Sequence, residues 1–205
     1  MPALRTLVDA LDAGSNTGAG YTFLSEGRTR TCSYAEIGLA ARRIAAGLRA
    51  SGLGRGDVAA IVIGDAEPFL TTLIGAALAG VVPASLYPPS PTADLPRFFD
   101  TTANVLAAAK ARAVITISAL APGFRALRSR HPHLEFVFTP DDLDSPATTD
   151  DWRPSLDDVA FIQYTSGSTS MPKGVVVTHR SLAANIDAIH ESSCVSWLNS
   201  PAPLM

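Results

Sequence analysis

A stretch towards the carboxyl end of the chain combines hydroxyl groups, glycines and a lysine in a way suited to holding phosphate. The candidate residues are Thr165, Ser166, Gly167, Ser168, Thr169, Lys173 and Gly174. Hydroxyls and backbone N–H groups in such a loop bind anionic oxygens, and Lys173 adds one mobile positive charge. Gly167 and Gly174 permit close backbone approach and a positive φ. We interpret this stretch as an exposed phosphate-binding loop, the alternative being an ordinary Ser/Gly-rich hairpin loop.

The order of the residues excludes the Walker type of phosphate loop. That loop needs Gly-Lys-Ser/Thr leading into a helix whose N-terminus holds the phosphate. Here Lys173 precedes Gly174, and the β-branched residues 175–177 that follow are typical of a strand. An apolar run at 159–164 precedes the loop and also has strand character. The loop is therefore predicted to connect two strands.

The string closely resembles the phosphate loop of the adenylate-forming (AMP-binding) superfamily, which includes acyl-CoA synthetases, luciferases, peptide-synthetase adenylation domains and fatty-acyl-AMP ligases. Gln163–Thr169 followed by Ser170, where the other branches usually carry glycine, is most similar to the fatty-acyl-AMP ligases. Pro172–Val175 is shared by all branches. Ser33–Ile37 resembles the family's first, structural motif, and Leu78–Pro89 resembles the fatty-acyl-AMP ligase form of its second. The resemblance extends in outline over almost the whole chain.

This resemblance implies acyl adenylation, in which a carboxylate attacks the α-phosphate of ATP and pyrophosphate leaves. The four hydroxyl residues of the loop would hold the β- and γ-phosphates. Lys173 would be the catalytic residue that neutralises charge on the leaving pyrophosphate, and Gly167 and Gly174 would let the loop fold over the nucleotide. The implied cofactors are ATP and Mg²⁺, with no metal ligand assigned to this chain. In the complete form, a fatty acid and an acyl carrier protein or polyketide synthase would be the partners.

The resemblance also implies that this is an N-terminal fragment of a fatty-acyl-AMP ligase, inactive alone. The family's adenine-stacking aromatic residue, Mg²⁺-binding acid, ribose-binding aspartate, hinge and C-terminal catalytic lysine would all follow Met205. Residues 199–205 depart from the family pattern, which continues with a proline and a His-Asp pair. Two alternatives stay open. One is a fragment of an acyl-CoA synthetase, and the other is a non-catalytic remnant or interaction module.

The elements that must position the loop are predicted from apolar periodicity. Val/Ile-rich runs lie at 58–63, 81–86, 113–117 and 134–138, and the first is continuously apolar, as expected for a strand inside a parallel sheet. Helical patterns lie at 4–11, 34–51, 66–79, 95–112 and 119–130, with a hairpin across Glu26 and Gly27 and strand character again at 195–198. Asp65 and Thr178 are candidate helix caps.

This alternation predicts an α/β fold of doubly wound parallel sheets with flanking helices, matching incomplete N-terminal subdomains of the adenylate-forming fold. We expect a first α/β subdomain over 1–138 and a solvated acidic linker over 139–158. The next subdomain, with the phosphate loop, would begin at 159 and run to 205. The strands beside the loop should lie apart from the main layer or at its edge.

Composition limits the remaining possibilities. The chain has 205 residues, 47% of them hydrophobic and 17% charged, which suits a folded domain. A net charge of −3 gives no reason to expect nucleic acid as a partner. Cys32 and Cys194 make neither a disulfide framework nor a metal quartet, and His131 with His133 is a helix-end loop rather than a metal site. With no signal-peptide pattern and no apolar run long enough to span a membrane, a cytoplasmic location is expected.

Overall fold

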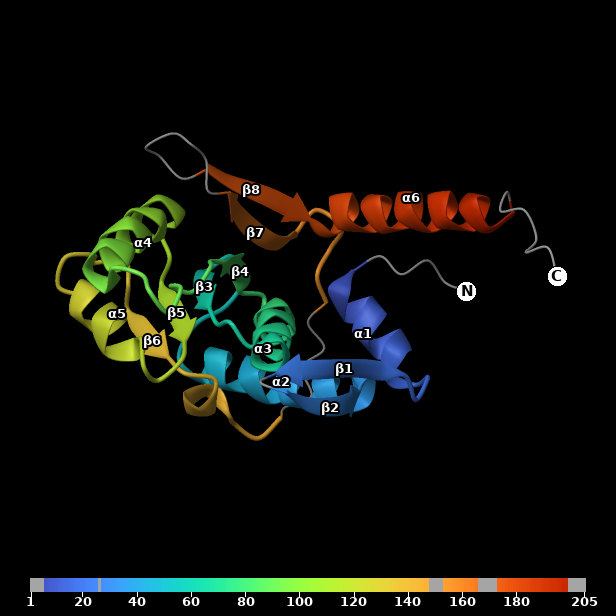
Figure 1. The fold of residues 1–205 in the computed structure, drawn as a ribbon, viewed down its shortest axis with the longest axis horizontal. Coiled ribbons are helices and arrows are strands. Elements are labelled where there is room, and N and C mark those ends of the chain that lie inside the picture. Colours follow the sequence, from blue (N-terminus) through green and yellow to red (C-terminus); the bar gives the residue numbers. More distant parts are fainter. Residues whose placement is uncertain (1–5, 26, 148–152, 166–172, 199–205) are drawn as a thin grey trace.

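The computed structural model describes residues 6–25, 27–147, 153–165 and 173–198 (Figure 1). Its helices are α1 (Leu7–Ser15), α2 (Tyr34–Ala50), α3 (Ala66–Ala79), α4 (Leu95–Ala109), α5 (Ala121–Leu127), the 3-10 turn η1 (Asp141–Leu143) and α6 (His179–Leu198). Its strands are β1 (Gly20–Ser25), β2 (Arg28–Ser33), β3 (Val58–Val62), β4 (Val82–Ser85), β5 (Ala113–Thr116), β6 (Phe136–Phe138), β7 (Val159–Thr165) and β8 (Lys173–Thr178).

Six strands form one sheet in the order β6-β5-β3-β4-β7-β8, and all neighbouring pairs are parallel except β7 with β8. The chain adds β4 on one side of β3 and then crosses back to add β5 and β6 on the other, which is doubly wound topology. The predicted α/β class is confirmed. The strands beside the phosphate loop complete one edge of this sheet, while the predicted subdomain boundaries stay a prediction.

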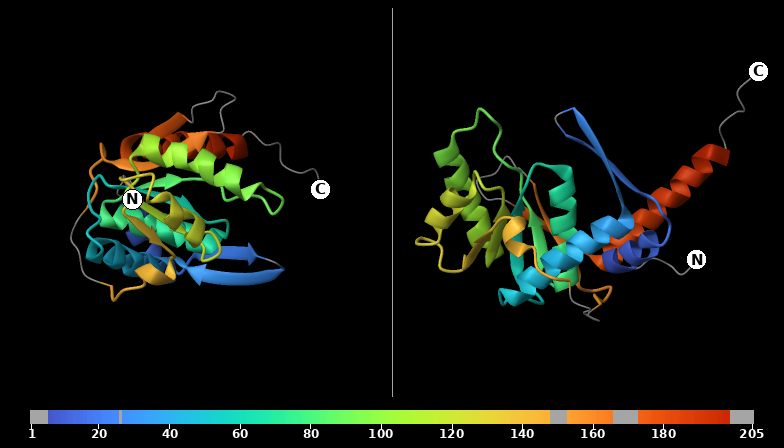
Figure 2. Two further views of the ribbon diagram at one scale, coloured as in Figure 1. Left: turned by 90° about the vertical axis from the view of Figure 1, so that its left-hand side faces the viewer. Right: turned by 90° about the horizontal axis from the view of Figure 1, so that it is seen from below.

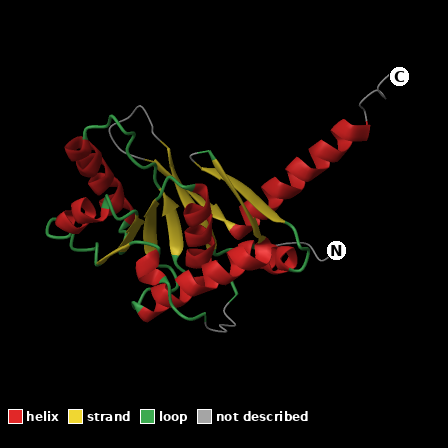
Figure 3. Cartoon of the chain, turned by 60° about the horizontal axis from the view of Figure 1, so that its bottom comes forward, coloured by secondary structure: helices red, strands yellow, loops and turns green. Residues whose placement is uncertain are grey.

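Alternate residues of the central strands feed two separate hydrophobic cores. Ala59 and Ile61 of β3 pack with α1, α2 and α3, whereas Ala60 and Val62 pack with α4 and α5. This follows from the period-two alternation of a strand, which sends successive side chains to opposite faces of the sheet. Figure 3 shows the sheet between its two helical layers. Both faces are therefore covered, as the continuous apolar run at 58–63 predicted.

Two elements extend from this body. The expected hairpin, formed by the antiparallel strands β1 and β2, and the long helix α6 both project away from the sheet (Figure 2). Strand character at 195–198 was the expectation from sequence, and it is wrong, because α6 continues as helix to Leu198. No glycine or proline interrupts 179–198, so nothing in the chain ends the helix before those apolar residues.

The acidic segment after β6 is more closely packed than a solvated linker. Leu143 of η1 is fully buried in the core beneath α2. Next to it, Arg43 Nη2 of α2 donates to Asp144 Oδ2 over 2.7 Å, and this pairing lowers the pKa of Asp144. A single leucine between acidic residues gives no periodic signal, so its burial could not be predicted from pattern.

The helix ends are set by local chemistry. Gly80 terminates α3 in the left-handed conformation at φ 78°. Asp65 occupies the N-cap position of α3, but its side chain makes no capping hydrogen bond. Instead, Asp65 Oδ1 accepts a 3.4 Å hydrogen bond from Ser25 Oγ of the hairpin. The expected cap at Asp65 is therefore replaced by a tertiary contact.

Candidate functional site

The carboxyl ends of β3, β4 and β7 meet at one edge of the sheet because these strands are parallel. A cleft of about 480 Å³ opens there. Its lining residues come from the segments that follow β3 and β4 and from the end of β7: Ile63, Gly64, Phe69, Leu86, Tyr87 and Tyr164 among them. Ligands of open α/β sheets bind in crevices at this edge. The segment that carries the candidate phosphate loop leaves β7 at the same place.

The two ends of that loop are held together by the β7–β8 ladder. Thr165 pairs with Lys173, and Tyr164 pairs with Gly174 in antiparallel register. Both ends of the loop are therefore paired backbone, and Lys173 stands where β8 begins. Four of the candidate residues, Ser166, Gly167, Ser168 and Thr169, lie outside the described residues. For Thr165 the backbone is described and the side chain is not.

Lys173 is exposed at this neck of the loop. Within the described part of the chain, no ion pair links its ammonium group to a carboxylate. A lysine without a carboxylate partner keeps its charge available for an incoming anion. Lys173 pairs with Thr165, which directly follows the cleft-lining residue Tyr164, and its expected role stays a prediction.

Gly174 does not use the positive φ that its residue type permits. It lies in extended strand β8 and is not one of the glycines with positive φ. Glycine is needed here because a neighbouring side chain occupies the space that a Cβ would fill. A Cβ added to Gly174 would lie 3.0 Å from both Cε1 and Cζ of Tyr164, whose ring crosses it. Burial in this packing raises the pKa of the Tyr164 hydroxyl. The need for close backbone approach at Gly174 was attributed from the sequence to a bound phosphate, and the contact with Tyr164 was not identified.

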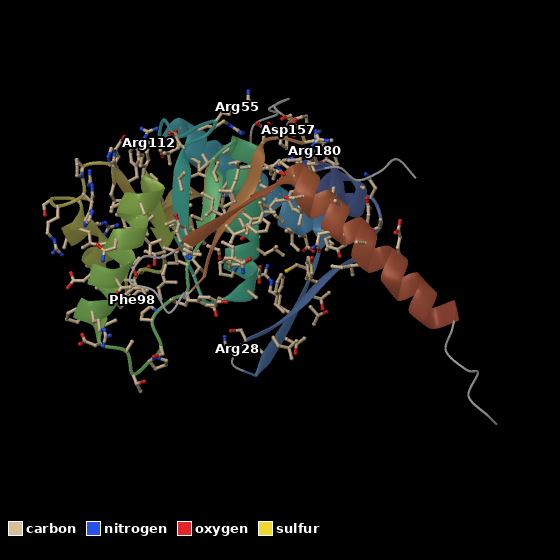
Figure 4. All side chains as sticks on the ribbon, turned by 90° about the horizontal axis from the view of Figure 1, so that it is seen from above. Arg28, Arg55, Phe98, Arg112, Asp157 and Arg180 are labelled. Carbon is tan, nitrogen blue, oxygen red and sulfur yellow. The ribbon has the colours of Figure 1, made fainter. Side chains whose placement is uncertain are left out.

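Ion pairs anchor the opposite end of the β7–β8 pair, where α6 begins (Figure 4). Arg180 donates two hydrogen bonds to Asp157, of 2.9 and 3.1 Å, and Arg55 Nη2 donates to Asp158 over 2.9 Å. Thr178 caps α6 as predicted, since its Oγ1 accepts the backbone N–H of Ser181 over 3.2 Å. The strand that leaves the phosphate loop is thus fixed at its far end.

His179, the first residue of α6, is a buried histidine that joins this region to the N-terminal helix. It is only 2% exposed, and its Nδ1 accepts a 3.3 Å hydrogen bond from the backbone N–H of Leu7. Burial lowers the pKa of His179, although Asp158 and Asp9 act in the opposite direction. No local signal in the sequence indicates this long-range partner.

Acidification should therefore weaken the fold before the carboxylates titrate. The pKa of His179 is lower in the folded than in the unfolded chain, so between the two values the unfolded chain binds more protons. Stability is then complete above the unfolded value, about 6.5, and falls as the pH drops below it, by at most about 1.4 kcal/mol per pH unit. Denaturant unfolding measured from about pH 7.5 to 5.5 tests this.

The control is His179→Asn, which keeps an acceptor oxygen near the position of Nδ1 but cannot be protonated. We expect its stability to stay level over the same range, because His131 and His133 lie outside this buried contact. An equal loss of stability in the wild type and in His179→Asn would contradict the assignment.

Nothing in the described ranges suggests a metal centre or a membrane span. No group of three or more histidine, cysteine or acidic side chains there is placed to hold a metal ion. Likewise, none of the helices that can be described has the length and apolar character needed to cross a bilayer. Cys32 is a buried free thiol, and burial raises its pKa.

Comparison with known proteins gives consistent matches. Residues 12–203 match the family described as AMP-binding enzyme. The medium-chain-fatty-acid–[acyl-carrier-protein] ligase JamA of Moorena producens is 31% identical over 93% of this chain and 34% of its own length. The 4-coumarate–CoA ligase 3 of Oryza sativa subsp. japonica is 32% identical over 80% of this chain and 30% of its own.

Solved structures agree with these relatives. A structure from a study of fatty acyl-adenylate ligases from E. coli and L. pneumophila superposes with a TM-score of 0.82 at 30% identity, covering 90% of this chain and 34% of that one. The adenylation domain of a keto acid-selecting peptide-synthetase module gives a TM-score of 0.82 at 25% identity, over 94% and 35% of the two chains. The chain thus spans about a third of the length of the relatives it matches.

Proposed function

The chain belongs to the AMP-binding enzyme family, and on that premise we propose that it supplies the triphosphate-binding part of a fatty-acyl-AMP ligase. The complete form would activate a fatty acid with ATP, release pyrophosphate and pass the acyl group to an acyl carrier protein or a polyketide synthase. The observation that carries this proposal is the position of Lys173. It stands exposed where the candidate phosphate loop rejoins the sheet, opposite Thr165, which directly follows the cleft-lining residue Tyr164.

The chemistry assigned to the chain is the binding of the triphosphate tail. Phosphoryl-type transfer is catalysed mainly by positioning and charge stabilisation, with little covalent chemistry by the protein. Lys173 would neutralise charge on the β- and γ-phosphates and then on the departing pyrophosphate. The hydroxyls of Thr165, Ser166, Ser168 and Thr169 would bind the phosphate oxygens, with Gly167 and Gly174 giving the backbone room. Mg²⁺ would share this charge when bound, held by acidic groups that we assign to the part of the relatives' length that this chain does not span.

The fatty-acyl branch is supported by the Gln163–Ser170 string and by the likeness to fatty acyl-adenylate ligases and JamA. The acyl-CoA synthetase branch is the second candidate, favoured by the 32% identity to a 4-coumarate–CoA ligase. The two differ in the acceptor of the acyl group. Measuring whether the complete ligase forms a thioester with CoA or with a carrier protein identifies this acceptor.

The 205-residue chain alone should not catalyse fatty-acid-dependent exchange of labelled pyrophosphate into ATP. Positioning contributes effective molarities worth about 7–11 kcal/mol in such reactions. That contribution needs contacts to adenine, ribose, Mg²⁺ and the carboxylate, which we assign to the part of the relatives' length that this chain does not span. The assay is run with and without fatty acid, and a full-length fatty acyl-adenylate ligase is the positive control.

Exchange clearly above the blank without fatty acid, and lost in Lys173→Ala, would mean that these residues hold a complete active site. The proposal of a triphosphate-binding part would then be wrong. Failure of the chain to bind ATP at all would favour instead a non-catalytic remnant or an interaction module.

A further inference from the structure

The pairing of β8 with β7 is weakly specified along most of its length. Three consecutive valines, 175–177, lie opposite Gln163, Ile162 and Phe161. Val175 and Val176 point to opposite faces of the sheet yet are almost equally exposed, at 52% and 57%. Because the two faces of the strand are almost equally exposed here, a one-residue shift in register would change the burial of the three valines little.

The far end of β8 is held by the ion pairs of Asp157 and Asp158 and by the cap at Thr178, but these contacts lie beyond an irregularity in the ladder. β8 ends the order of strands in the sheet, so it pairs on one side only among the described strands. Its register with β7 is already irregular between Val159 and Phe161. Between that irregularity and the phosphate loop, the register of β8 against β7 depends on contacts within the ladder itself.

Gly174 is the one residue of β8 without a Cβ, and it lies under the ring of Tyr164. A Cβ at this position would come within 3.0 Å of the ring and 3.1 Å of Ile162 Cγ2. A slip in either direction would bring the Cβ of Lys173 or Val175 into that space. An aromatic side chain covering a cross-strand glycine is a known device for fixing register.

We propose that Tyr164 is a positioning residue: by covering Gly174 it sets the register of β8 and thereby places Lys173 opposite Thr165. This inference rests on the proposed function only for what Lys173 binds. A one-residue slip would move Lys173 by about 3.3 Å along the strand and turn its side chain to the other face of the sheet. The lysine would then no longer lie opposite Thr165 at the neck of the loop.

The test measures the affinity of the 205-residue chain for inorganic tripolyphosphate by calorimetry. The variants are Tyr164→Ala, Tyr164→Phe, Gly174→Ala and Lys173→Ala. We expect Tyr164→Phe to bind within about twofold of wild type, because it keeps the ring. Tyr164→Ala should weaken binding at least about tenfold, the scale of a lost charge-assisted hydrogen bond. Gly174→Ala should weaken it too, by displacing the ring.

Two further readouts separate positioning from general damage to the fold. The double variant Tyr164→Ala/Lys173→Ala should bind no more weakly than Lys173→Ala, because both changes act through the lysine. In the wild type and in Tyr164→Phe, nuclear Overhauser effects should connect residues 163 and 175, which are paired in the structure. In Tyr164→Ala these effects should weaken, and new ones to residue 176 or 174 should appear.

The outcomes distinguish this inference from the proposed function. If Lys173→Ala weakens tripolyphosphate binding while Tyr164→Ala binds like wild type, the positioning role is wrong and the proposed function stands. If Tyr164→Ala weakens binding but keeps the native 163–175 contacts, the register mechanism is wrong. If Lys173→Ala leaves binding unchanged, or the wild type does not bind, the proposed function itself fails.

Discussion

Replacing Gly47 with alanine will destabilise the chain by at least about 2 kcal/mol. Gly47 lies in the buried face of α2, where the backbone of η1 crosses the helix. A Cβ there would stand 2.1 Å from the carbonyl oxygen of Leu143 and 2.7 Å from its carbonyl carbon. Neither atom belongs to a flexible side chain, so α2 and the segment around η1 would have to separate. The gain in helix propensity, about 1 kcal/mol, is too small to offset this.

Gly38→Ala is the matched control, because it makes the same change in the same helix. There the added Cβ meets the end of the Arg42 side chain at 3.1 Å and Ser15 Oγ at 3.4 Å, both of which can move by a few tenths of an ångström. We expect its free energy of unfolding to be unchanged or raised by up to about 1 kcal/mol. Denaturant unfolding of both variants and of the wild type measures these differences in the free energy of unfolding. Equal stabilities for Gly47→Ala and Gly38→Ala would show that the contact with Leu143 is not a fixed part of the fold.

The central strand of the sheet was predictable because its apolar run is continuous. Residues 58–62 carry no polar side chain, which favours a strand buried on both faces, and the structure divides them between two cores. The extent of the last helix was not predictable in the same way. An apolar run such as 195–198 is compatible with helix or strand, and only the unbroken helical stretch before it decides between them.

Long-range contacts were the main omission at the candidate site. The loop residues and Lys173 were predicted from an ordered motif, and the structure places Lys173 and Thr165 opposite each other at its neck. The hydrogen bond from Leu7 to His179 joins residues 172 positions apart, and no pattern within either segment indicates it. The contact between the Tyr164 ring and Gly174 joins two neighbouring strands. It depends on the register of those strands, which local sequence does not define.

Lys173→Ala will lower the affinity of the chain for ATP by about tenfold to hundredfold and leave its stability almost unchanged. A charge-assisted hydrogen bond contributes about 1.5–3 kcal/mol, and Lys173 is the exposed cation at the neck of the loop. Because its side chain is exposed and makes no ion pair with another described residue, the fold loses little when it is removed. A severe drop in melting temperature would mean instead that the lysine is structural.

The most direct measurement is the calorimetric titration of the wild type, Lys173→Ala and Lys110→Ala with ATP and, separately, with AMP. Lys110 is the other lysine of the chain; it is exposed at the end of α4, so its removal changes the net charge equally. We predict that the wild type and Lys110→Ala bind ATP alike and bind AMP much more weakly, and that Lys173→Ala loses the preference for ATP. Equal affinities for ATP in all three proteins would contradict the assignment of residues 165–174 as the triphosphate-binding loop.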